Sequence, residues 1–183
     1  MKANGFDPRS LDVAAAAKQG VTCDGETALA AMPRLAESAH EATPPGAGDT
    51  VLWQARCESR PVRGAASQVW LHLRAETHLW LVCQRCLQPV AVDVHGRRSF
   101  QFVAGEADAA RLDADSEDDV LALTRSLDLL ALAEDELLLN LPLVPRHEVC
   151  PQPLPLAAGP ALPDDAPHPF AALAALKRGG QQG

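Results

Sequence analysis

The sequence lacks any long apolar run. Nowhere in its 183 residues do eighteen apolar residues follow one another without interruption, whereas a helix that crosses a bilayer needs about twenty. The first residues, MKANGFDPRSLD, have no apolar stretch behind the lysine, which a secretory signal would require. These absences predict neither a membrane span nor a secretory signal, and they favour a cytoplasmic protein.

Familiar catalytic motifs are also missing. The sequence contains no glycine-rich phosphate loop, no nucleophile elbow and no paired-histidine motif of zinc hydrolases. Glu134, Asp135 and Glu136 are consecutive in a helical pattern, so their side chains would point in different directions instead of forming a general acid and base pair. The sequence does not suggest an enzyme.

The composition is that of a globular protein with irregular terminal segments. Hydrophobic residues make up 47% and charged residues 22%, and a chain of this length usually has one main core. We predict a single α+β domain over residues 1–150 and a Pro-rich linker over 151–168. A short tail helix is predicted at 169–178, and it would be marginal by itself because isolated helices of this length barely form in water.

Charge is spread unevenly along the chain. The net charge is -8, yet residues 51–101 carry seven arginines against three acids. The planar guanidinium group of arginine can donate two parallel hydrogen bonds to one phosphate. The alternative is a set of ordinary surface arginines on a small sheet, because a pI near 5.1 is unlike that of a typical nucleic-acid binder. The seven are Arg56, Arg60, Arg63, Arg74, Arg85, Arg97 and Arg98.

The centre of the chain alternates with the period of a β-strand. Over residues 69–83 every second residue is apolar or small, namely Val69, Leu71, Leu73, Ala75, Thr77, Leu79, Leu81 and Cys83. One strand of this length would be unusual, so we expect a hairpin that bends around residues 73–76. Further strands are predicted at 51–57 and 90–103. The fold class is α+β, with an antiparallel sheet or partly open barrel of about 4–6 strands.

Helices are expected on both sides of the strand region. Asp7 and Pro8 favour a helix that runs to about residue 18, and a second stretch near 28–39 is interrupted by Pro33. In the C-terminal half a long helix is predicted over 128–141, capped by Asp128 and ended by Pro142. The acidic segment 104–119 has no apolar period and predicts a solvated loop.

The other face of the central strand region carries aromatic and basic side chains, namely Trp70, His72, Arg74, His78 and Trp80. Such a stripe can stack nucleic-acid bases while arginine holds phosphate. Tryptophans on a second face more often pack under a covering helix. We favour the second interpretation, with helix 128–141 as the cover.

Two of the five cysteines have the spacing of metal ligands. Cys83 and Cys86 form a CxxC pair where a strand ends, and His147 and Cys150 follow the predicted long helix. Together they would make a Cys3His site for one structural zinc. Free or buried thiols are the alternative. A redox pair is less favoured, because the flanks of the CxxC predict strand, turn and strand instead of a helix N-terminus.

Three separated segments resemble the YceD-type family of large ribosomal RNA subunit accumulation proteins. They are CQRCLQPV at 83–90, DLLALAEDELLLNLPLVPRH at 128–147 and HPFAALAALKR at 168–178. Many members of that family have a cysteine-rich stretch after the VPxH segment. This sequence has only Cys150 there, so His147 would have to supply the fourth ligand.

The resemblance implies a non-enzymatic role in synthesis, processing or stability of large-subunit (23S) ribosomal RNA. The partner would be that RNA or its precursor, contacted directly or through a ribosomal or RNA-processing protein. Candidate contact residues are Arg85, Arg97 and Arg98 for RNA, and Phe170, Leu173 and Leu176 of the tail for a protein. A small zinc- or thiol-based regulatory or redox protein is the alternative function, favoured only by the CxxC pair.

Overall fold

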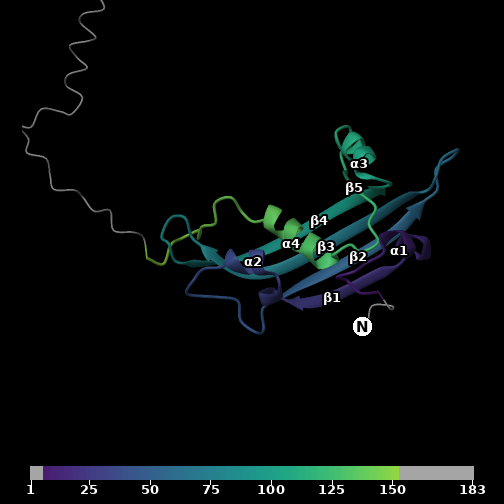
Figure 1. Ribbon diagram of the computed structural model, residues 1–183. Helices are drawn as coiled ribbons and strands as arrows, with labels where there is room; N and C mark the ends of the chain where they lie inside the picture. Colours follow the sequence, from purple (N-terminus) through teal and green to yellow (C-terminus); the bar gives the residue numbers. More distant parts are fainter. Residues whose placement is uncertain (1–5, 153–183) are drawn as a thin grey trace, which may run out of the picture. The chain divides into compact units, whose positions relative to one another are not determined.

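A single sheet organises the computed structural model, which describes residues 6–152. Its five strands follow one another in sequence order (Figure 1). The first four are antiparallel, and the short β5 is parallel to β4. The strands are β1 (Thr22–Ala28), β2 (Thr50–Arg60), β3 (Gln68–Val82), β4 (Pro89–Val103) and β5 (Asp119–Ala122). The predicted α+β class and largely antiparallel sheet are confirmed, and the sheet is open.

Strand β3 runs without a break through all fifteen of its residues. Ala75, at the position where a hairpin was predicted, pairs with Trp53 of β2 on one side and with Gly96 of β4 on the other. The predicted hairpin around residues 73–76 was therefore wrong. The length is stabilised by a continuous hydrogen-bonded neighbour on each side, which a local sequence pattern does not reveal.

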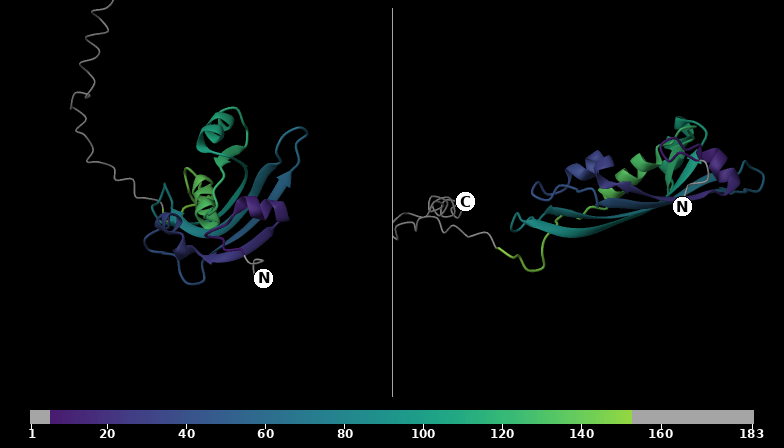
Figure 2. Two further views of the ribbon diagram at one scale, coloured as in Figure 1. Left: turned by 45° about the vertical axis from the view of Figure 1, so that its right-hand side comes forward. Right: turned by 90° about the horizontal axis from the view of Figure 1, so that it is seen from below.

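The period-two pattern predicted the buried face of β3 correctly. Leu71 and Leu73 are fully buried, and Ala75, Thr77, Leu79 and Leu81 are nearly so. Helices α1 (Val13–Gln19), α2 (Pro33–Glu37) and α4 (Leu129–Leu139) all lie on this side of the sheet (Figure 2). A short 3-10 turn, η1 (Leu29–Ala31), precedes α2. The hydrophobic core is thus one layer between the sheet and these helices.

The first helix begins later than predicted. Asp12, not Asp7, caps α1 by accepting a hydrogen bond from the Ala15 backbone N–H at 2.9 Å. Leu11, inside the predicted helix, instead forms a β-bridge with Leu127, which ties the start of the domain to the segment before α4. Pro33 opens α2, since proline is tolerated at the first helical position.

Helix α4 carries the predicted cap but is shorter than expected. The Asp128 carboxylate accepts hydrogen bonds from the backbone N–H groups of Leu130 and Ala131. The helix has eleven residues and ends at Leu139, with Asn140 as its C-cap, so a long helix is not confirmed. Two of its acids, Glu134 and Glu136, are almost fully buried. Polar side chains therefore take part in fixing this helix to the domain.

Each buried acid of α4 has an arginine partner. Glu134 accepts hydrogen bonds from the Arg34 guanidinium and from the Leu35 backbone N–H. Glu136 accepts one from Arg98 Nε at 2.6 Å. A Cβ atom at Gly96 would lie 2.6 Å from Glu136 Cγ. The glycine therefore permits the close approach of α4 to β4.

The acidic segment 104–119 is not the solvated loop that was predicted. Helix α3 (Glu106–Asp113) occupies half of it, and β5 begins at its last residue. The Asp113 carboxylate accepts a hydrogen bond from the Val120 backbone N–H at 2.9 Å. Only Ala109 of α3 is buried, so the helix has too little apolar periodicity to be found from its sequence.

The aromatic and basic stripe of β3 faces away from the helices, and the expectation that α4 covers it was wrong. The cover lies over the opposite, apolar face (Figure 2). Trp80 is 42% exposed. Trp70 is buried locally, because the Arg60 guanidinium carbon lies 4.4 Å from its ring centroid. The sheet thus has one face packed by helices and one face of polar and aromatic side chains.

Among residues 6–152, none of the helices has the length and apolar character that crossing a membrane requires. The predicted tail helix 169–178, with Phe170, Leu173 and Leu176, lies outside the described residues, as does the predicted linker from residue 153 onward.

Candidate metal centre

The CxxC pair lies in the tight turn that joins β3 to β4. Two backbone hydrogen bonds close the turn, from Cys83 N to Gln88 O and from Leu87 N to Cys83 O, both at 2.9 Å. Leu87 has a left-handed φ of 61°, an uncommon conformation for a branched side chain. This compact turn holds Cys83 and Cys86 against each other, and both are buried.

The chain that follows α4 returns to this turn. Gln84 N donates a hydrogen bond to Pro145 O at 2.8 Å, which aligns the segment after α4 with the turn. His147 and Cys150 then reach the two cysteines. The structure thus brings together the two halves of the predicted site, which are about sixty residues apart in sequence.

The four predicted ligand atoms converge. The sulfur atoms of Cys83, Cys86 and Cys150 and a ring nitrogen of His147 all lie within 4.8 Å of one another. Cys83 Sγ lies 3.9 Å from Cys150 Sγ, and Cys86 Sγ lies 3.5 Å from His147 Nδ1. These four residues form the Cys3His group.

The two shorter separations fit a tetrahedral zinc ion. With Zn–S near 2.3 Å and Zn–N near 2.05 Å, a tetrahedral angle puts two sulfur ligands about 3.8 Å apart and a sulfur and a nitrogen about 3.6 Å apart. The separations of 3.9 Å and 3.5 Å lie close to these values. Three thiolates and one imidazole would occupy all four positions, which is the pattern of a structural site.

The far side of the histidine ring is fixed as well. His147 Nε2 lies 3.1 Å from the Pro89 carbonyl oxygen. A metal-binding histidine commonly donates its second N–H to a carbonyl, because this sets the tautomer and orients the ring. His40 supports the turn in the same way, with Nε2 at 3.1 Å from Leu87 O. Neither contact follows from residue spacing, so sequence reasoning missed both.

Arg85, between the two cysteines, closes over the group. Its Nε lies 2.9 Å from Cys150 Sγ, and its NH2 donates to the carbonyl oxygens of His147 and Glu148 at 2.8 and 3.0 Å. Hydrogen bonding to Cys150 raises the pKa of the Arg85 guanidinium. These three contacts make Arg85 part of this centre.

The thiols of the chain differ in acidity. Burial opposes ionisation of Cys83, but hydrogen bonds from the backbone of Arg85, His147 and Cys86 outweigh it and lower the pKa of Cys83 to about 5. By contrast, burial raises the pKa of Cys57 to about 12 and also raises that of Cys23. Cys23 and Cys57 are therefore inert core thiols, whereas Cys83 is suited to bind a metal ion as a thiolate.

The three arginines predicted to contact RNA are not brought together. Arg85 belongs to the metal centre. Arg98 lies on the helix-covered side, where it binds Asp119 at 2.8 Å and Glu136 at 2.6 Å, and those two contacts raise its pKa. Arg97 lies on the uncovered face and has no ion-pair partner among residues 6–152.

Comparison with known families gives one match. The family model described as "Large ribosomal RNA subunit accumulation protein YceD" matches residues 71–177. That span starts in β3 and includes all four members of the Cys3His group. No solved structure matches the chain.

Proposed function

This chain belongs to the YceD family, and from that membership we propose that it is a non-enzymatic factor in the synthesis, processing or stability of large-subunit (23S) ribosomal RNA. The observation that carries the proposal is the family match, which covers more than half of the chain. The cytoplasm is the compartment in which we place this activity.

The acidic and cysteine side chains that resemble catalytic groups have structural partners. Glu134 and Glu136 are bound to Arg34 and Arg98 beneath α4. Cys83 and Cys86 are grouped with a third cysteine and a histidine, which would fill all four positions of a zinc ion and leave none for a substrate. These arrangements support a binding or assembly role over an enzymatic one.

In the proposed function the Cys3His group holds one structural zinc ion. The ion would join the β3–β4 turn to the segment after α4, in addition to the hydrogen bonds that Gln84 and Arg85 already make to that segment. Zinc lacks redox chemistry, and a closed four-ligand site contributes directly to folding stability. Its role is to fix the end of the domain.

The partner is large-subunit RNA or its precursor, reached directly or through a ribosomal or RNA-processing protein. For the protein route, contact through Phe170, Leu173 and Leu176 of the tail remains a prediction from the sequence.

Co-sedimentation tests the proposal. Lysate from cells that carry a tagged full-length chain is fractionated on a sucrose gradient, and RNA recovered with the tagged chain is sequenced. We expect the chain in fractions that contain large-subunit precursors, with 23S sequences enriched over 16S sequences. Recovery at the top of the gradient alone, without ribosomal RNA, would contradict the proposal.

A second function is favoured by the short distances between thiols. A thiol-based regulator would exchange the zinc-bound thiolates for a disulfide on oxidation, and Cys83 Sγ and Cys150 Sγ are already 3.9 Å apart. In that case mild peroxide should release zinc and form a disulfide. The same treatment should change the activity of whatever protein this chain regulates. Unchanged association with ribosomal precursors after oxidation would argue against this alternative.

A further inference from the structure

We propose that the uncovered face of the sheet binds single-stranded RNA and that Arg74 and Arg97 hold its phosphates. This inference rests on the proposed function and deepens it, because it makes the contact with RNA direct and places it on defined residues. Arg74 thus joins Arg97 as a proposed RNA contact, in place of Arg85 and Arg98, which have other partners.

The central observation is a pair of arginines opposite each other. Arg74 of β3 and Arg97 of β4 are partners in the antiparallel register, which puts their Cβ atoms about 5 Å apart. Like charges in such positions destabilise a sheet. Neither residue forms an ion pair with an acid in the described part of the chain. An anion between them would relieve their repulsion.

The unpaired state of this pair is distinctive among neighbouring arginines. Arg56 and Arg60 both bind Glu58, and Arg98 binds Asp119 and Glu136. Folding has therefore provided acids for arginines close to the pair while leaving the pair itself free. A phosphate-binding site needs arginines whose N–H groups are not already bound to acids, since bidentate arginine contacts to phosphate are strong and directional.

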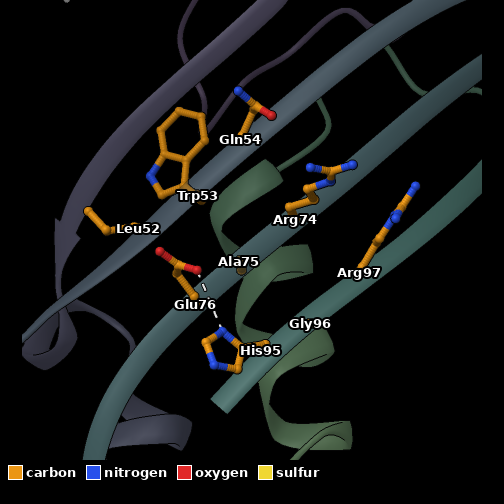
Figure 3. Close-up of a pocket in the computed structure, with 9 residues that line it drawn as sticks. All are labelled: Leu52, Trp53, Gln54, Arg74, Ala75, Glu76, His95, Gly96 and Arg97. Atoms are coloured by element: carbon orange, nitrogen blue, oxygen red, sulfur yellow. Dashed lines mark ion pairs between the residues drawn. The ribbon is translucent and has the colours of Figure 1, made fainter. Parts of the chain in front are cut away.

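The arginine pair also lines a hollow surface. Two adjoining hollows of about 420 and 370 Å³ share Gln54, Arg74 and Arg97. Figure 3 shows these three side chains on the near side of the strands, with helix α4 behind them. The Gln54 amide lies in the same cross-strand row, because Gln54 pairs with Arg74. The row thus offers two guanidinium groups and one amide to a single ligand, and it ends at Asp24 of β1 on the far side of the amide.

Charge is polarised along this face. Near Trp70 it carries four arginines, Arg56, Arg60, Arg74 and Arg97. The acids there are Glu58, which binds Arg56 and Arg60, and Asp24 of β1 beside Gln54, while Glu117 and Asp118 line a hollow with Arg97. Towards the other end the acids Glu76 and Asp93 each contact a histidine, His95 at 3.5 Å and His78 at 2.8 Å. Because neither Arg74 nor Arg97 forms an ion pair with these acids in the described residues, the arginine end favours a polyanion despite the net charge of -8 of the whole chain.

An exposed tryptophan provides a stacking surface on the same face. Trp80 is 42% exposed, and the His78 ring meets it edge-on with centroids 5.9 Å apart. It lies six residues from Arg74 on β3, a distance of about 20 Å along the strand. Stacking on an aromatic ring needs an unpaired base, which a single strand offers and a duplex does not. Phosphates at the arginines and a base at Trp80 together indicate single-stranded RNA.

Binding of a labelled single-stranded RNA of about 16 nucleotides to the purified full chain tests the inference, measured by fluorescence anisotropy over a series of salt concentrations. The test variant is Arg74→Gln/Arg97→Gln. The control is Arg63→Gln/Arg125→Gln, which removes the same charge from exposed positions that are not in the strands of this face.

We expect the test variant to bind about tenfold more weakly for each arginine removed. Its salt dependence should flatten by about 1.4 in logarithmic slope, since each phosphate contact to a single strand contributes about 0.7. The control should bind like the unaltered chain. Trp80→Ala should weaken binding about tenfold, and Trp80→Phe should restore most of it, because either aromatic ring can stack.

Several results would overturn the inference. One is equal binding by the test and control variants, and another is tighter binding of a duplex of the same length than of the single strand. If the test variant binds RNA normally but no longer co-sediments with large-subunit precursors, the face serves a protein partner instead. These results leave the proposed function intact, whereas absence of the unaltered chain from precursor fractions would count against that function itself. Thermal unfolding separates lost binding from lost folding, because removal of the like-charged pair should not lower Tm.

Discussion

At the scale of single residues, the five cysteines divide into two chemical groups. Cys23 and Cys57 are buried in the core, where the cost of burying a thiolate keeps them protonated. Cys83, Cys86 and Cys150 meet His147 at the end of the sheet. The same residue type is a small hydrophobic side chain in one place and a metal ligand in the other.

The metal centre predicts one zinc ion per chain. We expect about one equivalent in freshly purified protein, and its loss in Cys83→Ser, because one missing thiolate opens a four-ligand site. If free zinc is present at a thousandfold over its Kd, loss of zinc binding lowers the free energy of unfolding by about 4 kcal/mol. Metal content by mass spectrometry and unfolding in denaturant measure both effects.

Cys23→Ala is the matched control for this prediction. It removes a buried thiol outside the Cys3His group, so zinc content should not change. Metal-free protein whose melting curve is also insensitive to chelator would contradict the zinc assignment.

The pKa of Cys57 predicts a loss of stability in alkaline solution. Burial raises this pKa from 9.0 to about 12, so the folded chain holds the proton after the unfolded chain has released it. The contribution to stability is complete below pH 9 and is lost between pH 9 and about 12, with a slope of up to about 1.4 kcal/mol per pH unit. The difference in unfolding free energy between the unaltered chain and Cys57→Val should change over this pH range. If this difference in unfolding free energy stays constant from pH 8 to 11, the pKa of Cys57 is not raised by burial.

At the scale of elements, the contact between α4 and β4 is closely fitted. Gly96 leaves room for the aliphatic part of Glu136, whose carboxylate then reaches Arg98 and the Asn140 amide. The helix is therefore fixed by shape and by buried hydrogen bonds together. A buried carboxylate is tolerated here because each oxygen has a partner.

Gly96→Ala should destabilise the domain. The added Cβ would lie 2.6 Å from Glu136 Cγ, so the helix must shift or the Glu136 side chain must leave its partners. Overpacking of this kind lowers the free energy of unfolding by about 1–3 kcal/mol. Gly48→Ala is the control, since a Cβ there meets nothing within 4 Å. Equal unfolding midpoints for the two variants would show that α4 does not pack on Gly96.

The elements that the sequence predicted are those with a strong local signal. Alternation over residues 69–83 identified the buried face of β3, and Asp128 identified the start of α4. The unbroken course of β3 was missed because it depends on pairing with both β2 and β4. Helix α3 and strand β5 were missed because an acidic segment has little apolar pattern, and the hydrogen bond from Val120 to Asp113 is a tertiary contact.

At the scale of the whole molecule, the Cys3His group and the candidate RNA-contacting arginines differ in how far the sequence predicts them. Residue types and short spacings were enough to select the four members of the Cys3His group. They were not enough to separate three similar arginines, because the partners of Arg85 and Arg98 are distant in sequence. Nor could they show which face of β3 remains open, since this depends on where α4 packs.

These features describe a domain with a helix-packed side, a Cys3His group at one end and an open face that carries an unpaired arginine pair among the described residues. It agrees with the family to which the chain belongs, described by large ribosomal RNA subunit accumulation.

The ratio of 23S to 16S ribosomal RNA in cells that lack this protein tests the central claim most directly. We expect the ratio to fall, with fewer mature large subunits and small-subunit RNA comparatively intact, at ordinary and at low growth temperature. The full chain supplied from a plasmid should restore the ratio. A normal ratio at both temperatures would contradict the account.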